Sequence, residues 1–229
     1  MGVTNTLTAP PTAGVLARLF AAAQAQEAAH DRAEAAEPDG GTPPVPEEQL
    51  TALERANARQ NAYMPISAEG GRLLYALTRA ARPQTVVEFG TSFGISTIFL
   101  AAGVIDNGAG QVVSTELSAA KIRAARENLH QAGVDGPVTV LAGDARETLA
   151  DVPGPIGLVL LDGWKDLYLP VLHLLEPRLA PGALVIADDS SFASVAGYLA
   201  YVRDPAHGYV TVSFPVEDGM EISSWTGGN

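Results

Sequence analysis

The chain has 229 residues, 47% of them hydrophobic, and a formal net charge of −12 at pH 7. This is enough for one sizeable core with an appendage. The negative charge excludes a broad basic patch for nucleic acid, and the lack of cysteine excludes disulfides, thiolate metal sites and cysteine nucleophiles. No apolar run reaches the roughly 20 residues that cross a bilayer, and no secretion signal is visible, so we expect no membrane partner and a cytoplasmic location.

Residues 1–60 are predicted to form an N-terminal helical extension. Apolar residues recur at helical spacing within 12–37, a linker rich in proline and glycine follows at 38–46, and a second helix is expected at about 47–60. This extension either packs as a helical layer on the main domain, or serves as a lid over a substrate pocket or as the arm of a homodimer.

Residues 61–229 are predicted to form the main domain. Ser67 is expected to cap a helix over Ala68–Ala81. Strands are then expected at 85–89, 111–115, 138–141, 156–161 and 183–187, and helices at 95–104, 118–131, 144–150, 166–179 and 194–203. This alternation is typical of an α/β fold with a doubly wound parallel sheet. Two further strands, over Tyr209–Phe214 and Met220–Trp225, complete a seven-stranded, mostly parallel sheet whose last strand is antiparallel.

A glycine-containing turn follows the first predicted strand, in residues 86–97 (VVEFGTSFGIST). Backbone amides at such a helix start favour a negatively charged group. Gly90 and Gly94 are spaced Gly-x-x-x-Gly, however, which serves a dinucleotide pyrophosphate poorly. Glu88 would repel phosphate and suits a ligand that carries an amine. The alternative is an ordinary tight turn between a strand and a helix.

Acidic residues also end the next two predicted strands. Glu116 is suited to accept both hydroxyls of a ribose, as in enzymes that bind dinucleotides or adenosyl ligands. Ser118 can cap the following helix, which leaves Glu116 for a ligand. Asp144 is equally suited to bind an adenine amino group and to cap the helix that starts near Ala145.

The stretch 158–190 brings charged residues to one edge of the predicted sheet. It reads as a strand, a helix and a strand, and because such a unit is a right-handed crossover, both strands end at the same edge. The residues just after those ends are Asp162, Lys165, Asp188 and Asp189. Carboxylate oxygens suit Mg²⁺, and a lysine beside a bound cation loses its proton more easily, as a general base must. Salt bridges between the lysine and neighbouring acids are the alternative.

These motifs together resemble those of a known enzyme family. Residues 161–170 (LDGWKDLYLP), the aspartate pair after a Pro-Gly turn, and residues 198–203 (YLAYVR) are similar to the signatures of catechol O-methyltransferase and the small metal-dependent, caffeoyl-CoA-type O-methyltransferases. The resemblance covers about residues 63–229. It implies the Rossmann-like fold of the class I S-adenosylmethionine-dependent O-methyltransferases.

The resemblance also implies a cofactor, a metal and residue roles. The cofactor would be S-adenosylmethionine, the metal Mg²⁺ or another divalent cation, and the methyl acceptor a hydroxyl of a small molecule, either catechol-like or a specialised metabolite. Asp162, Asp188 and Asp189 would bind the metal, and Lys165, with Asp162, would carry catalysis by taking the hydroxyl proton. The cofactor would contact Ile66, Glu88, Gly90, Ser92, Ser96, Glu116, Asp144, Ala145 and Asp162, and the acceptor would contact Met64, Trp164 and Lys165.

The chain departs from the family at three positions. Asp189 stands where the family usually has asparagine, and Gly163 replaces a histidine before the tryptophan. The loop at 204–217 is shorter than in the family and gives no clear counterpart of the glutamate that binds the second hydroxyl of catechol, for which Glu217 is a candidate. The alternative functions are a metal-independent methyltransferase on the same fold, a nicotinamide oxidoreductase, which the glycine spacing disfavours, and a catalytically silent cofactor-binding subunit.

Overall fold

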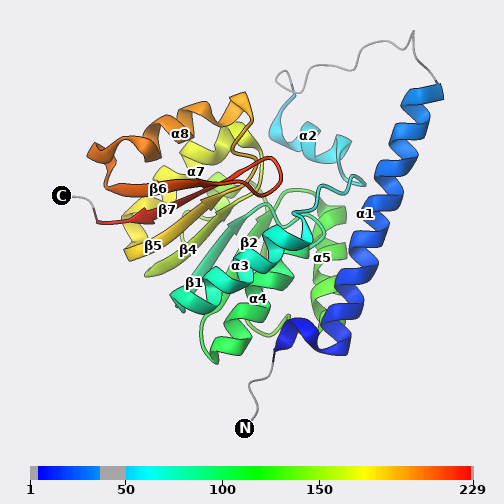
Figure 1. Ribbon diagram of the computed structural model, residues 1–229, viewed down its shortest axis with the longest axis horizontal. Coiled ribbons are helices and arrows are strands. Elements are labelled where there is room, and N and C mark those ends of the chain that lie inside the picture. Colours follow the sequence, from blue (N-terminus) through cyan, green and yellow to red (C-terminus); the bar gives the residue numbers. More distant parts are fainter. Residues whose placement is uncertain (1–4, 37–49, 228–229) are drawn as a thin grey trace.

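The structure, a computed structural model, describes residues 5–36 and 50–227 and is built around a seven-stranded sheet in the order β3-β2-β1-β4-β5-β7-β6 (Figure 1). The strands are β1 (Thr85–Phe89), β2 (Gln111–Glu116), β3 (Val138–Ala142), β4 (Ile156–Leu161), β5 (Leu179–Ala187), β6 (Tyr209–Phe214) and β7 (Met220–Trp225). Strands β1 to β5 pair in parallel, and β7 is antiparallel to both of its neighbours. The predicted doubly wound sheet with an antiparallel last strand is confirmed.

The helices are α1 (Pro10–Ala36), α2 (Ala52–Ala58), α3 (Ala68–Ala81), α4 (Ile95–Asn107), α5 (Ala119–Ala132), α6 (Ala145–Thr148), α7 (Tyr168–Leu175) and α8 (Ala196–Arg203). The side chain of Ser67 caps α3 as predicted, by accepting a hydrogen bond from the N–H of Gly70. Two apolar clusters fill the two faces of the sheet, because successive strand residues point to opposite sides. Helices α1, α3, α4 and α5 contribute to one cluster, and α6, α7 and α8 contribute to the other.

The prediction for residues 166–179 was wrong in detail. A single helix was expected there, but the structure has a 3-10 turn at Lys165–Leu167, then α7, then a second 3-10 turn at Glu176–Arg178. Pro177 has no N–H to continue an α-helix, which explains the change after Leu175. Strand β5 starts at Leu179, ahead of the predicted start, and a shift of register on β4 accommodates the extra residues.

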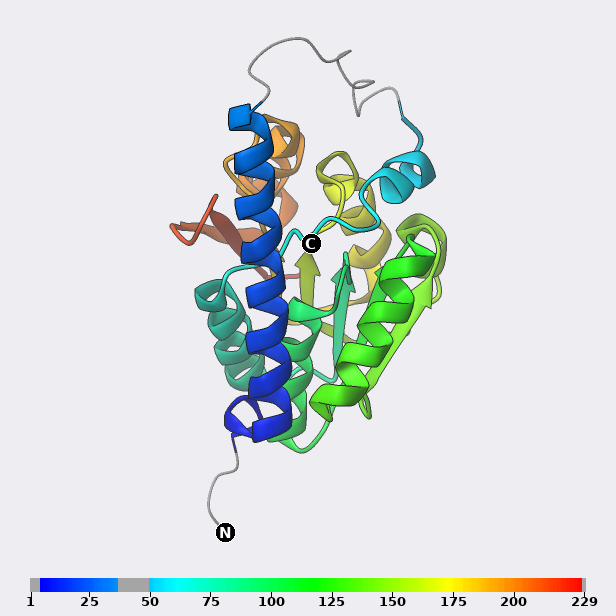
Figure 2. The same ribbon diagram turned by 90° about the vertical axis from the view of Figure 1, so that its right-hand side faces the viewer.

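Helix α1 packs on the main domain alongside α5 (Figure 2). The predicted apolar face is the one that is buried, with Leu19 fully enclosed. Thr12 and Arg18 donate hydrogen bonds to the carbonyl of Ala132 and the side chain of Asn128 on α5, at 2.9 and 2.8 Å. The predicted linker at 38–46 and the first part of the second predicted helix lie outside the described residues.

The register of the sheet aligns the ends of three central strands. Phe89 pairs with Leu161, and Leu161 pairs with Ala187. The next residues along the chain, Gly90, Asp162 and Asp188, therefore emerge side by side at the carboxyl edge of the sheet. None of the described helices is long and apolar enough to cross a membrane.

Candidate active site

A cavity of about 580 Å³ opens at the carboxyl ends of the parallel strands. This is the edge at which open α/β sheets bind their ligands. All of the site residues predicted from the sequence line this cavity except Glu88: they are Met64, Ile66, Gly90, Ser92, Ser96, Glu116, Asp144, Ala145, Asp162, Trp164, Lys165, Asp188 and Asp189. The structure thus brings together residues from six separate segments of the chain.

The turn after β1 needs glycine for two separate reasons. Gly90 has a φ of +109°, a conformation that residues with a side chain rarely adopt. A Cβ at this position would also lie 2.3 Å from the backbone oxygen of Asp162. Gly90 thus permits the close approach of this turn to the backbone that follows β4.

Glu116 is held by backbone amides at the end of β2. Its carboxylate accepts hydrogen bonds from the N–H groups of Ser92, Leu117 and Ser118 at 2.9, 2.9 and 2.8 Å. Ser118 caps α5 through the N–H of Lys121, so Glu116 is not needed as the cap. The prediction that Ser118 caps this helix is confirmed, and the contact of Glu116 with a ribose stays a prediction.

Asp144 caps α6, one of the two roles that the sequence left open. Its carboxylate accepts a hydrogen bond from the N–H of Arg146 at 2.9 Å and forms an ion pair with that guanidinium at 2.6 Å. The hydrogen bond from Arg146 holds the pKa of Asp144 below its usual value. Asp144 still lines the cavity, so a contact with adenine stays a prediction.

Glu88 lies outside the cavity wall and is turned towards α4. Its Oε2 accepts hydrogen bonds from Thr97 and Ser114, both at 2.5 Å. Burial raises the pKa of this carboxyl group, and its Oε1 has no hydrogen-bond partner among the residues that the structure describes. The predicted contact between Glu88 and an amine of the cofactor stays a prediction, and this placement of the carboxylate does not favour it.

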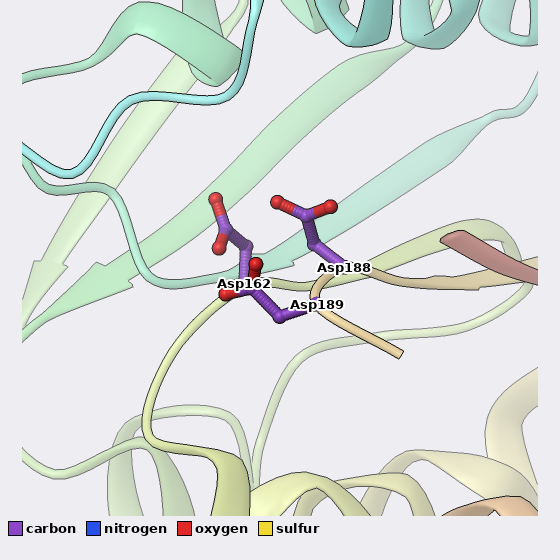
Figure 3. A group of neighbouring side chains, drawn as sticks. All are labelled: Asp162, Asp188 and Asp189. Carbon is purple, nitrogen blue, oxygen red and sulfur yellow. The ribbon is translucent and has the colours of Figure 1, made fainter. Parts of the chain in front are cut away.

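Three carboxylates converge beside the ends of β4 and β5. One carboxylate oxygen from each of Asp162, Asp188 and Asp189 lies within 4.8 Å of the other two, and Figure 3 shows the three side chains gathered there. Consecutive residues of an extended chain point to opposite sides. Asp189 has a left-handed backbone with φ +55°, and this break in the alternation lets both aspartates face the cluster.

This cluster carries more negative charge than its protein neighbours offset. Burial raises the pKa of Asp162 well above its usual value, and repulsion from Asp188 adds to the effect. Burial and the charge of Asp189 raise the pKa of Asp188 to about 7. The Oδ1 of Asp188 is buried without a hydrogen-bond partner in the described part of the chain. An oxygen left unpaired among three carboxylates fits a hard divalent cation.

Lys165 borders the same cluster. Its ammonium lies 2.6 Å from Oδ2 of Asp189 and 3.6 Å from Oδ1 of Asp162, and it donates a hydrogen bond to the hydroxyl of Tyr168 at 2.7 Å. Burial favours the neutral amine, but the carboxylates of Asp162 and Asp189 outweigh it and raise the pKa of Lys165. These neighbours therefore keep the lysine protonated unless their charge is offset.

The sequence did not single out Lys121, which also lines the cavity. The side chain is only 4% exposed, and its ammonium lies 5.5 Å from the ring of Phe93, which stacks on Tyr63. Burial lowers the pKa of Lys121, with Glu116 and Asp162 opposing. The sequence could have indicated Lys121 as a residue of the site, because it lies three residues after the cap Ser118 and the first turn of that helix is at the carboxyl edge of the sheet.

Apolar and acidic side chains also line the cavity: Met64, Trp164, Phe192 and Glu217. The carboxylate of Glu217 accepts a hydrogen bond from the N–H of Ser67 at 2.7 Å. Glu217 thus lies in the same cavity as the aspartate cluster.

Comparison with known proteins agrees with this geometry. A family model described as a methyltransferase domain matches residues 87–190. Catechol O-methyltransferase B of Danio rerio is 28% identical over 196 residues, which cover 80% of this chain and 73% of that protein. The "Probable O-methyltransferase" Rv1703c of Mycobacterium tuberculosis is 30% identical over 165 residues, 67% of this chain and 70% of that one.

The solved structures give the same result. Cofactor-bound Rv0187 from MTB superimposes with a TM-score of 0.66 at 26% identity and covers 82% of this chain and 100% of its own. These matches favour a methyl-transfer enzyme over the nicotinamide oxidoreductase and the silent subunit. The chain therefore belongs to the class I S-adenosylmethionine-dependent O-methyltransferases.

Proposed function

We propose that the chain methylates one hydroxyl of an aromatic vicinal diol, a catechol, and that it needs a divalent cation such as Mg²⁺ to do so. The observation that carries the proposal is the cluster of Asp162, Asp188 and Asp189 with Lys165 at its border. The acceptor class is supported by the relatives named catechol O-methyltransferase in Danio rerio and Mycobacterium tuberculosis.

The proposed cofactor contacts are supported by the residues that line the cavity. S-adenosylmethionine supplies an electrophilic methyl group on a cationic sulfonium. Glu116 would accept the ribose hydroxyls, an assignment supported by the three backbone amides that fix its carboxylate. Gly90 would allow the cofactor to approach the backbone, and Ser96 would bind the methionine part. The surplus of carboxylates lowers the cost of holding a positively charged donor.

Asp162, Asp188 and Asp189 would hold the cation, which as a Lewis acid would stabilise the ionised acceptor hydroxyl. Lys165 would take the hydroxyl proton onto its Nζ. Because the carboxylates raise the pKa of Lys165, it can act as a base only when their charge is offset. Much of the remaining rate acceleration would come from fixing the acceptor oxygen in line with the methyl group.

The acceptor would lie with its ring between Met64 and Trp164. Glu217 would accept a hydrogen bond from the second hydroxyl, an assignment supported by its position on the cavity wall and by its hydrogen bond from Ser67. A second hydroxyl held in this way explains why a diol would be preferred over a simple phenol. These roles for Met64, Trp164 and Glu217 are part of the proposal.

The test measures methyl transfer from labelled S-adenosylmethionine to catechol, with added Mg²⁺ or with excess EDTA. We expect activity that EDTA abolishes and Mg²⁺ restores. Lys165→Met should lower kcat by about 10² to 10⁴, the range for loss of a general base, while the Kd of S-adenosylmethionine changes less than about threefold. An equal loss of both quantities would contradict the base role. Full activity in EDTA would make the protein a metal-independent methyltransferase.

A further inference from the structure

Helix α2 forms part of the cavity wall although it belongs to neither helical layer of the sheet. Figure 1 shows it, in cyan, apart from α3, α4 and α5. Ala52 and Ala56 line the cavity, as does Arg59 just after the helix. The helix has seven residues, too few to be stable by itself, so its position depends on its contacts with the rest of the chain.

One side chain, Arg55, joins α2 to the turn that follows β4. Its guanidinium forms a two-pronged ion pair with Asp166, with Nη1–Oδ1 2.9 Å and Nη2–Oδ2 3.0 Å. The same group lies over the ring of Trp164, with its central carbon 4.9 Å from the ring centroid. Only an arginine can make both contacts, because its planar fork matches a carboxylate and also stacks on an aromatic face.

Arg55 is more enclosed than a typical surface ion-pair residue. Its side chain is 13% exposed, and its Nε is buried without a hydrogen-bond partner among the described residues. Its partner Asp166 is 54% exposed, so the ion pair alone contributes little, and the contact of the guanidinium with the indole ring adds to it.

The two residues that Arg55 contacts flank Lys165 on either side. Trp164, Lys165 and Asp166 are consecutive and lead into the 3-10 turn after β4. A displacement of Trp164 or Asp166 would therefore also move the ammonium of Lys165 relative to the aspartate cluster. Arg55 itself is not among the residues that line the cavity, whereas the three aspartates of the cluster are.

A capping box defines the start of α2, and contacts with α1 hold the segment that follows its end. At its start, Thr51 and Glu54 form a capping box. After its end, the side-chain amide of Gln26 on α1 donates to the carbonyl of Asn61 at 2.8 Å and accepts from the N–H of Tyr63 at 2.6 Å. The helix is thus held in place in the cavity wall, and Arg55 links it to the turn that contains Lys165.

We propose that Arg55 is a positioning residue for the acceptor: it clamps α2 against Trp164 and Asp166 and thereby decides which of two neighbouring hydroxyls faces the methyl donor. The inference rests on the proposed catechol specificity. A shift of the Trp164 wall by a fraction of an ångström would change the orientation of the ring without touching the cofactor. The expected signature is a changed product ratio at nearly unchanged cofactor affinity.

The kinetic test uses 4-methylcatechol, whose two hydroxyls give two distinguishable methyl ethers. Arg55→Met should raise the KM for this acceptor about tenfold, equivalent to ~1.4 kcal/mol, and change the ratio of the two products at least threefold. The Kd of S-adenosylmethionine should stay within threefold. Arg55→Lys keeps the charge but loses the fork and should fall in between. Arg82→Met, which removes an arginine outside the cavity wall, is the matched control and should leave all three quantities unchanged.

A second readout needs no activity. The chain has two tryptophans, so Trp225→Phe leaves Trp164 as the only one. In that background, Arg55→Met should at least double the acrylamide quenching constant of Trp164, and Asp166→Asn should raise it less. Asp166→Asn also serves if Arg55→Met fails to fold. An unchanged quenching constant overturns the clamp, and a raised constant with an unchanged product ratio overturns its role in acceptor choice. A wild-type protein that does not methylate catechols refutes the proposed function, while the quenching data still judge the clamp.

Discussion

The affinity of the aspartate cluster for Mg²⁺ should depend steeply on pH, because the cation must displace a proton. Burial and the charge of Asp189 raise the pKa of Asp188 from 3.8 to about 7. A shift of about three units represents about 4 kcal/mol of preference for the protonated form. Below pH 7 the proton and the cation therefore compete for the same carboxylate.

The expected size of this effect follows from the titration of a single group. The apparent Kd for Mg²⁺ should rise about tenfold for each pH unit below 7, so that it is roughly a hundredfold weaker at pH 5 than well above pH 7. Isothermal calorimetry from pH 5.5 to 8.5, in two buffers of different ionisation enthalpy, measures the Kd for Mg²⁺ and the number of protons released for each Mg²⁺ bound. At pH 6 Asp188 should release nearly one proton for each Mg²⁺ bound, and Asp162, whose pKa burial also raises, should add to that number; at pH 8.5 Asp188 should release close to none.

The same group contributes to the pH dependence of the stability of the metal-free protein, with a definite sign. The folded state keeps a proton on Asp188 that the unfolded chain releases near pH 4. Between pH 4 and 7 the folded state therefore binds this extra proton, and the contribution of Asp188 to the free energy of unfolding falls as pH rises. Asp151→Asn, which removes one exposed carboxylate away from the cavity, is the matched control. A Kd for Mg²⁺ that stays constant from pH 5.5 to 8 would refute the reasoning.

Three further substitutions test the geometry. Asp188→Asn should raise the melting temperature of the metal-free protein at pH 8 by several degrees, since it removes a buried charge, and should abolish the Mg²⁺ binding measured by calorimetry; a lower melting temperature would argue against repulsion in the cluster. Gly90→Ala should destabilise the protein by at least about 2 kcal/mol in urea unfolding and weaken S-adenosylmethionine binding, because its Cβ would meet the backbone of Asp162 at 2.3 Å; wild-type stability would mean that the turn can relax. Leu19→Ala should cost about 2–5 kcal/mol in the same experiment if α1 is part of the core, and a loss below about 0.5 kcal/mol would make it a detachable arm.

Local sequence patterns predicted most of the sheet and the edge at which the cavity opens. Strands β1, β4, β6 and β7 were predicted with their observed bounds, because buried parallel strands form continuous apolar runs between turn residues. The position of the aspartate cluster followed from the right-handed crossover alone. Pattern reasoning failed where backbone hydrogen bonding overrode side-chain periodicity, as at Pro177, where the predicted helix breaks.

Contacts between distant residues were beyond the reach of the sequence. Arg55 and Asp166 are 111 residues apart, and nothing in either segment indicates that they pair. Glu88 was predicted to contact the cofactor because it sits near a strand end; its carboxylate instead accepts hydrogen bonds from Thr97 and Ser114, and the contact with the cofactor stays a prediction. Lys121 was overlooked because a lysine on an amphipathic helix is normally a solvent-exposed residue.

The left-handed turn at Asp189 also has a consequence for how the cluster could be re-engineered. Asparagine tolerates this conformation about as well as aspartate, so replacing one carboxylate oxygen by an amide nitrogen should leave the backbone path intact. The ammonium of Lys165, 2.6 Å away, would lose its nearest counter-charge and be drawn less tightly to that side of the pocket. Asp189→Asn would thus separate two properties of this residue. It would keep the left-handed turn of the backbone and would change the basicity of the amine of Lys165.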